Sequence, residues 1–194
     1  MNGKPGSAVT PNRHLLPTQQ SPTLEMTVTL PPNSTAPAPK LQPTGWLRYF
    51  SFSVDHKVIG LQYLVCGFVF YLIGGALAGA IRTELASPVA DFMARDVYNQ
   101  VLTLHGTVMI FLWIVPVVNG AFGNYLIPFY VGARDMAFPR LNAVAFWLIP
   151  PAGLMLVASY FITGAAQSGW TAYPPLSITT PATGQIIWIV SVLL

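Results

Sequence analysis

An uncharged stretch of 24 residues, from Val58 to Ile81, constrains this chain more than any other feature of its sequence. The hydrocarbon core of a bilayer is about 30 Å thick, and ~20 residues of α-helix cross it. The stretch therefore predicts a membrane-spanning helix. Glycines let helix backbones approach closely in membranes, so we expect Gly67, Gly75 and Gly79 to form a face that meets a neighbouring helix.

A second apolar region covers residues 97–133, which contain no Asp, Glu, Lys or Arg. These 37 residues are too many for one span and too few for two. We expect one long helix from about Val97 to Asn119 or somewhat beyond, which the sequence GAFGNYLIP then ends or bends.

The chain carries no charged residue from position 141 onward. Leu141 to Ala165 predicts a third span, and Pro150 and Pro151 near its middle should kink it because each removes a backbone donor. Residues 166–184 predict a Pro-rich loop, and Ile186 to Leu194 resembles the first turns of a fourth span.

Composition excludes several other classes of protein. Charged residues make up 8% of the chain and apolar residues 53%, whereas soluble domains carry about 25% charged residues. A net charge of +3 supplies no dense basic patch, so no nucleic acid is expected as a partner. The single cysteine, Cys66, excludes an internal disulfide. We therefore expect an all-α, polytopic transmembrane helix bundle whose surroundings are the lipid bilayer.

Residues 1–45 differ from the rest, with nine of the eighteen prolines and no apolar period. This composition predicts a disordered tail, and no apolar core typical of a secretory signal is present. We expect two regions, a tail over 1–45 and a helical domain over 46–194 that is cut within its fourth helix. Met26 is an alternative start.

Basic residues near the span ends predict the orientation. Five of them flank one side of the predicted spans and two flank the other. The larger group puts the N-terminus on the cytoplasmic side. The two groups are Lys40, Arg48, Lys57, Arg134 and Arg140 against Arg82 and Arg95.

His105 is the one ionisable side chain other than tyrosine in residues 97–133. It lies roughly 12 Å along the second span, where a neutral imidazole needs partners for both ring nitrogens. Histidine within a membrane is a functional candidate, as a metal or haem ligand or a proton relay. A bond to a carbonyl of a neighbouring helix is the alternative. Gly106 would let a bulky group approach, and Tyr98 and Met109 share the face of His105.

Asp135 is the second candidate, between Arg134 and Arg140 in the connection to the third span. It predicts either an ion pair within the loop or a proton collection point at the mouth of a polar channel. The amides of Asn124 and Asn142 could hold a water chain, or only cap helices.

Polar and aromatic side chains at the outer side have two interpretations each. Arg82 and Glu84 close the first span, where they predict an interfacial anchor; the arginine could instead donate to a buried cofactor. Trp170 and Tyr173 predict an aromatic belt or a donor to a cofactor carboxylate.

A series of motifs over residues 46–194 resembles the N-terminal part of subunit I of the haem–copper terminal oxidases, the cytochrome c oxidase type above all. The motifs occur in order and without large gaps. They are FSVDHKVIG (52–60), IRTEL (81–85), YNQVLTLHGTVMIFLWIVP (98–116), GNYLIP (123–128), GARDMAFPRLNAVAFWLIPP (132–151) and GWTAYPP (169–175).

The resemblance implies a membrane protein of roughly twelve helices, of which this chain holds the first three to four. The family reduces dioxygen to water and pumps protons. His105 matches an axial ligand of the low-spin haem, of the a type, in which axial imidazoles favour electron transfer. Arg82 and Tyr98 match residues that hydrogen-bond substituents of that haem, and Trp170 matches a donor near its propionates. Met109 is expected to share this cofactor site.

Three further residues acquire roles from the resemblance. Asp135 matches the entrance of a proton-uptake path, and Asn124 and Asn142 match amides along it. Glu84 matches a residue near a peripheral sodium or calcium site. Asn119 occupies a position that is usually apolar in the family.

Other parts of the family pattern fall outside this sequence. The second low-spin haem ligand, the ligands of the high-spin haem and the copper site belong to later helices, so the chain alone is expected to be inactive. The implied partners are oxidase subunits II and III and cytochrome c, which the uncharged stretch 58–81 favours over a quinol. The tail favours a bacterial plasma membrane, with a thylakoid or mitochondrial inner membrane as alternatives. A truncated, non-catalytic fragment or assembly module, or a small transporter with His105 as its proton relay, would be different functions.

Overall fold

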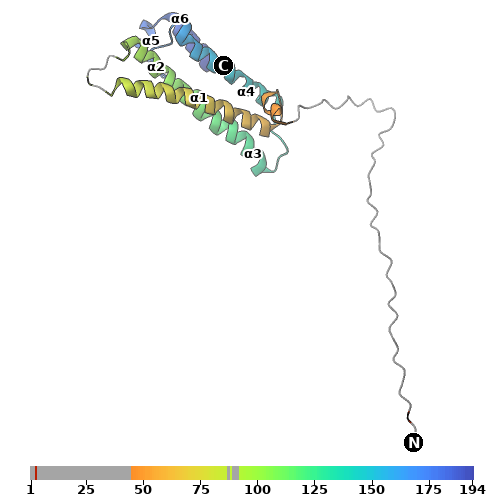
Figure 1. The fold of residues 1–194 in the computed structure, drawn as a ribbon. Coiled ribbons are helices and arrows are strands. Elements are labelled where there is room, and N and C mark those ends of the chain that lie inside the picture. Colours follow the sequence, from red (N-terminus) through yellow and green to blue (C-terminus); the bar gives the residue numbers. More distant parts are fainter. Residues whose placement is uncertain (1–2, 4–44, 87, 89–91) are drawn as a thin grey trace. The chain divides into compact units, whose positions relative to one another are not determined.

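The computed structural model describes residue 3, residues 45–86, residue 88 and residues 92–194. The disordered tail predicted for residues 1–45, and the alternative start at Met26, lie almost wholly outside these residues. Within them the chain is helical and contains no strand. Figure 1 shows the long helices lying side by side.

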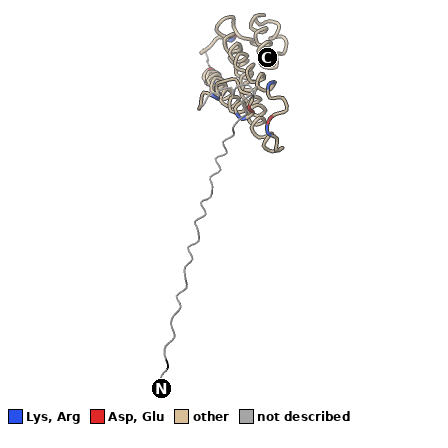
Figure 2. The backbone as a smooth tube through the Cα atoms, turned by 90° about the vertical axis from the view of Figure 1, so that its right-hand side faces the viewer, with Lys and Arg blue, Asp and Glu red and all other residues tan. Residues whose placement is uncertain are grey.

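Three helices are long and apolar enough to cross a membrane, which confirms the all-α transmembrane prediction. The helix that begins at Arg95 is the most buried of the three, with 44% of its apolar window inside the bundle. Figure 2 shows the charged residues of the described part at helix ends and in loops. The elements are η1 (Gly45–Phe50), α1 (His56–Glu84), α2 (Arg95–Thr107), η2 (Val108–Ile114), η3 (Pro116–Phe122), α3 (Gly123–Val131), α4 (Pro139–Ile162), α5 (Leu176–Thr179) and α6 (Ala182–Leu193).

Helix α1 starts at an N-cap that satisfies a free backbone donor. The Asp55 carboxylate accepts from the backbone N–H of Lys57 at 2.9 Å and also pairs with the Arg48 guanidinium. The buried amide of Gln62 donates to the carbonyls of Tyr49 and Ser51 at 3.0 and 2.9 Å. These bonds hold the short helix η1 against the first turns of α1.

The second helix is longer than the sequence suggested, because it runs for 37 residues from Arg95 to Val131. The end expected within GAFGNYLIP (120–128) is wrong, because the helix continues to Val131; the alternative, a bend there, stays a prediction. Two π-helical segments, η2 and η3, meet on either side of Val115, and Pro116 begins the second. Proline has no N–H to donate within a helix. The helix continues past Pro116 by changing from α-helical to π-helical turns. It stops at Gly132, whose φ of 68° is left-handed. Asn119 is exposed, and nothing in the structure explains it.

Helix α1 packs on this long helix through glycines spaced by seven residues. A Cβ at Gly60 would lie 3.0 Å from a backbone oxygen of η3, and one at Gly67 would lie 2.7 Å from a valine methyl group. At Gly74 it would lie 2.5 Å from a methionine sulfur. Seven residues are nearly two helical turns, so the three glycines share one face.

The predicted glycine face is therefore only partly right. Gly67 meets the neighbouring helix, but Cβ atoms at Gly75 and Gly79 would meet nothing within 4 Å. Gly75 is rotated about 100° around the helix from Gly74, which turns it away from the contact.

Gly74→Leu should destabilise the bundle much more than Gly75→Leu. The two changes add the same side chain one residue apart, but only the first forces it into the helix contact, where overpacking costs about 1–3 kcal/mol. The check is the fraction of folded protein left after heating in detergent, measured by size-exclusion chromatography. Equal losses in both variants would mean that the helices do not meet at Gly74.

The remaining helices complete the bundle. Helix α4 contains Pro150 and Pro151 in its interior without ending there; the predicted kink stays a prediction. It stops at Ile162, earlier than expected, before Gly164 with its φ of 77°. Helix α6 starts earlier than expected, after Pro181. Its tryptophan packs partly against the core formed by Phe70, Leu104, Val108, Leu112, Leu156 and Ala165.

Candidate functional site

His105 lies on α2, where its ring is half-buried and reaches across to α1. Its Nδ1 atom is 2.9 Å from the carbonyl oxygen of Gly74. A carbonyl only accepts, so Nδ1 carries the proton and donates it. The lone pair of the neutral ring is then on Nε2, and no described residue bonds to that atom. The carbonyl bond and the ligand interpretation are thus compatible, because the bond uses one nitrogen and orients the other.

Close approach of the two backbones makes this bond possible. The absence of a side chain at Gly74 leaves room for Met109, which lies one turn after His105 and packs over the glycine. Met109 therefore has a packing role beside the imidazole. The methionine supports the helix contact that places the Gly74 carbonyl opposite the ring.

Trp170 is the bulky group that approaches Gly106. A Cβ at Gly106 would lie 3.0 Å from Cδ1 of Trp170, and the Trp170 and Phe111 rings are 6.3 Å apart between centroids. Trp170 is 46% exposed. Trp170 thus lies against Gly106, the residue that follows His105 on α2, although 65 residues separate Trp170 from His105 along the chain.

Side chains of α2 accept hydrogen bonds from the loop that carries Trp170. The backbone N–H of Gly169 donates to Oγ1 of buried Thr103 at 2.8 Å. The N–H of Ala165 donates to Oε1 of Gln100 at 3.0 Å. Polar groups on α2 two and five residues before His105 thus fix the position of the loop that carries the tryptophan.

Thr103→Val should loosen this loop while keeping the shape of the side chain. The substitution removes the acceptor of the Gly169 N–H, and an unsatisfied donor costs about 1–3 kcal/mol. We expect faster amide hydrogen exchange over residues 165–171. Thr179→Val is the control, because Thr179 is exposed and bonds only within its own turn. Unchanged exchange in the Thr103 variant would contradict the role of this bond.

The C-terminal end of α1 carries Arg82 and Glu84. Arg82 is exposed. The Glu84 carboxylate accepts from the backbone N–H of Met93 at 2.9 Å and lines, with half-buried Tyr98, a cavity of about 610 Å³. No group of three or more His, Cys, Asp or Glu side chains forms a metal site among the described residues. A cation beside Glu84 would therefore rely on other oxygens, and this site stays a prediction.

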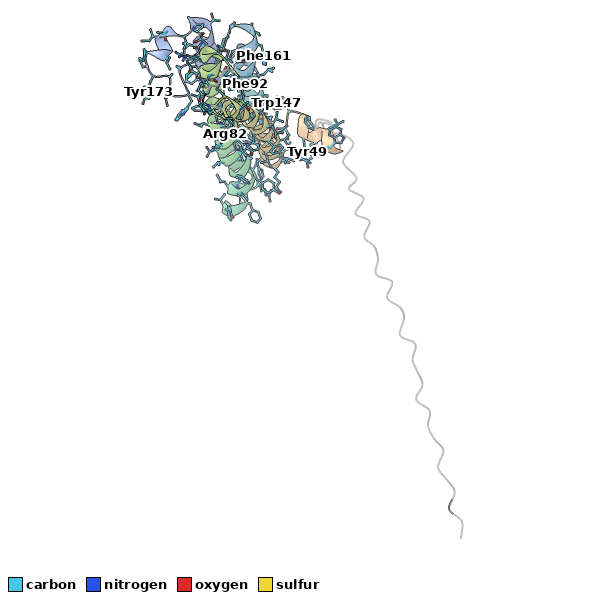
Figure 3. All side chains as sticks on the ribbon, turned by 60° about the vertical axis from the view of Figure 1, so that its left-hand side comes forward. Tyr49, Arg82, Phe92, Trp147, Phe161 and Tyr173 are labelled. Atoms are coloured by element: carbon cyan, nitrogen blue, oxygen red, sulfur yellow. The ribbon has the colours of Figure 1, made fainter. Side chains whose placement is uncertain are left out.

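Figure 3 shows Tyr49 and Tyr173 at opposite ends of the bundle. Tyr173 is 72% exposed and follows Trp170 in the same loop. It therefore lies at the end where α1 finishes and α2 begins.

Asp135 lies at the other end, in the loop between α3 and α4. Its Oδ1 is 3.1 Å from Nδ1 of His56 and accepts from the N–H of Met136 at 2.8 Å. The Asp135 side chain is 39% exposed, whereas that of His56 is 8% exposed. A pair with Arg134 or Arg140 was one expectation, but the partner in the structure is His56.

His56 was not predicted from the sequence as a site residue. It is 79 positions from Asp135, and only the packing of α1 against α3 and α4 brings the two together. One sequence feature could have identified it. His56 is the first residue of a membrane-spanning helix, and the start of a helix does not require an imidazole.

Asn124 and Asn142 form a direct hydrogen bond, a contact that the sequence did not predict; their role in a water chain stays a prediction. The Asn142 amide donates to Oδ1 of Asn124 at 2.5 Å, and the buried Asn124 amide donates to the carbonyl of Gly120 at 2.6 Å. Asn142 belongs to the first turn of α4, directly after the loop that carries Asp135. Hydrogen-bonding groups therefore continue from that loop into the bundle.

Comparisons with known proteins identify a family that the sequence matches. The sequence model described as "Cytochrome C and Quinol oxidase polypeptide I" matches residues 58–194. Cytochrome c oxidase subunit 1 of Thermostichus vulcanus is 62% identical over 149 residues, which cover 77% of this chain and 27% of the relative. The Synechocystis protein of that description gives the same values. That of Corynebacterium efficiens is 42% identical over 160 residues, covering 78% of this chain and 27% of the relative. The chain thus spans about a quarter of the length of these relatives.

Proposed function

The chain belongs to the cytochrome c and quinol oxidase polypeptide I family, and we propose that it forms part of the catalytic subunit of a respiratory terminal oxidase. In this proposal the oxidase takes electrons from cytochrome c, reduces dioxygen to water and pumps protons. The segment described here supplies one ligand of the low-spin haem and the entrance of a proton path. The relatives named above, all cytochrome c oxidase subunits, support cytochrome c as the donor.

The observation that carries the haem proposal is the bond from His105 to Gly74. A ligating histidine normally donates its other ring N–H to an acceptor, which fixes the tautomer and makes the ligand more basic. The 2.9 Å bond from Nδ1 to a carbonyl does this, and His105 as a residue is half-buried and not fully enclosed. The residues present therefore fit an axial ligand. A low-spin haem, when bound, supplies rapid one-electron transfer.

Other side chains in this proposal bind the haem periphery. Trp170 donates from its indole N–H. This role is supported by its close approach to Gly106, the residue next to the ligand. Arg82 and Tyr98 lie toward the same end of the bundle and donate to haem substituents. The haem is of the a type. The high-spin haem and copper bind outside the residues of this chain.

The proton path begins at Asp135 in this proposal. Its carboxylate is partly exposed and can exchange protons with water, while buried His56 orients it through the 3.1 Å contact. The Asn124–Asn142 pair lies further into the bundle and supplies amide groups that can orient water molecules. A carboxylate at the surface followed by inward amides is an arrangement suited to proton uptake.

The remaining assignments follow the same proposal. Oxidase subunits II and III are the partners, and Glu84 contributes to a peripheral sodium or calcium site. The protein is an integral membrane protein. We place it in a bacterial plasma membrane, with a thylakoid or mitochondrial inner membrane as alternatives, and its N-terminus on the cytoplasmic side, as the basic residues near the span ends favour.

A reduced-minus-oxidised absorption spectrum of the complex purified with this chain tests the proposal. We expect the band of a low-spin haem. A folded, membrane-inserted complex without any haem band would instead support an assembly module with no catalytic role.

A further inference from the structure

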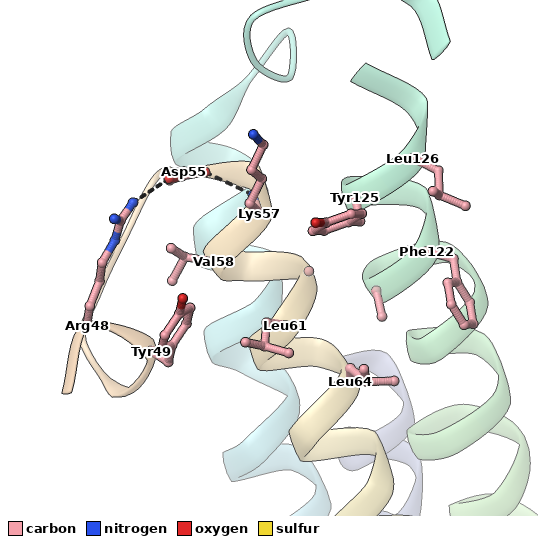
Figure 4. A pocket seen from close by; sticks show the side chains of 12 residues that line it. Arg48, Tyr49, Asp55, Lys57, Val58, Leu61, Leu64, Phe122, Tyr125 and Leu126 are labelled. Atoms are coloured by element: carbon pink, nitrogen blue, oxygen red, sulfur yellow. Dashed lines mark hydrogen bonds and ion pairs between the residues drawn. The ribbon is translucent and has the colours of Figure 1, made fainter. Parts of the chain in front are cut away.

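A groove of about 630 Å³ opens between η1, α1 and α3, at the end of the bundle that carries Asp135. Figure 4 shows its lining. Arg48 and Tyr49 come from η1, Lys57 and Leu64 from α1, and Phe122 and Tyr125 from the long helix. None of these residues takes part in the haem or proton sites proposed above.

The groove changes from charged to apolar along its length. Arg48, Asp55 and Lys57 surround its mouth. Lys57 and Leu64 are separated by about 10 Å along the axis of α1, a third of the thickness of the hydrocarbon core. Over that distance the lining becomes aliphatic and aromatic. A ligand that fills the groove must therefore combine a polar head with an apolar chain.

The charged residues at the mouth of the groove determine which charge the head of the ligand must carry. Arg48 and Asp55 form an ion pair at 2.5 Å, so their charges largely cancel. Lys57 is exposed, and its ammonium makes no ion pair with a described carboxylate. Figure 4 shows it standing away from Asp55 at the top of the groove. One uncompensated positive charge matches one phosphate diester.

The neighbouring surface has the composition of a membrane interface. Trp46 and Phe50 on η1 are 71% and 64% exposed and pack edge to face. Aromatic side chains gather at the level of lipid headgroups, which places the mouth of the groove at that level and its apolar part within the acyl region.

We propose that this groove binds a single anionic phospholipid. Its phosphate lies against Lys57 at the mouth of the groove, and one acyl chain lies over Leu64 and Phe122. A second transmembrane helix would fill only the apolar part and leave the Lys57 charge without a partner, so the lipid is the better occupant.

Native mass spectrometry of the purified complex tests this site with phosphatidylglycerol as the probe. Lys57→Gln should weaken phosphatidylglycerol binding about fivefold, the effect of one basic residue near a headgroup. Leu64→Trp, which fills the apolar part, should displace the lipid while Lys57 remains. Arg140→Gln is the matched control, because this exposed arginine lies at the same end but outside the groove; it should leave binding unchanged.

Each other outcome identifies a different occupant and overturns the proposal. Equal losses in the Lys57 and Arg140 variants would show general attraction to charge without a site. Displacement of the lipid by inorganic phosphate alone would indicate an anion site with no acyl chain. Unchanged lipid binding in both groove variants, with loss of complex assembly in Leu64→Trp, would show that another helix covers the groove.

Discussion

His105→Ala is expected to remove the low-spin haem band from the reduced-minus-oxidised spectrum of the purified complex. Alanine supplies no ligand, and no other histidine of the described residues lies on this part of the bundle, since His56 is at the opposite end of α1. Electron transfer through that haem, and with it oxygen consumption, should fall to background. The measurement is the absorption spectrum, normalised to the amount of folded complex.

His56→Ala is the matched control for the spectrum, because it removes the same side chain at the other end. The band should survive in that variant. Exogenous imidazole added to the His105 variant should restore part of it by occupying the space left by the ring. A full band in the His105 variant without added imidazole would refute the ligand assignment, and the bond to Gly74 would then be structural.

Asp135→Asn should lower turnover about tenfold or more while leaving the haem spectrum unchanged, since groups that transfer protons commonly contribute factors of 10²–10⁴. Asparagine has nearly the same shape and can still accept from the N–H of Met136. It cannot take up and release a proton. The loss should therefore appear in oxygen consumption and in protons released per electron.

Asp96→Asn makes the same chemical change in the first turn of α2, at the opposite end of the 37-residue helix. Its carboxylate is also exposed, so it controls for a general effect of charge. We expect normal turnover in this variant. Normal rate and proton stoichiometry in Asp135→Asn would show that protons enter elsewhere, and the contact with His56 would then only join the loop to α1.

The helices themselves were largely predictable. Uncharged stretches of this length have no stable place outside a membrane, and a helix is the structure that satisfies their backbone in lipid. The ends were less predictable. The long helix passes Pro116 and Asn119 because π-helical turns accommodate the proline, and no local pattern announces such turns. Gly132 was the better stop signal, since its left-handed φ needs a residue without a side chain.

The sequence singled out most of the candidate residues, although not His56, and it did not predict their contacts. His105 and Asp135 stand out because ionisable groups near apolar spans are costly and few. The resemblance implied that Asn124 and Asn142 lie along one path, but their direct hydrogen bond appears only in the structure. The glycine face of α1 was predicted only in part. Which glycines meet the long helix depends on the rotation of α1 about its own axis.

The order and number of the spans, and the chemical identity of the candidate residues, were properties of the sequence by itself, because both follow from where charge is absent. Tertiary structure alone decided that the Gly74 carbonyl orients His105, that His56 meets Asp135 and that Trp170 covers Gly106. The physical reason is that each of these contacts joins different elements. Their geometry is set by the register at which helices pack, and that register is decided by small side chains across the interface.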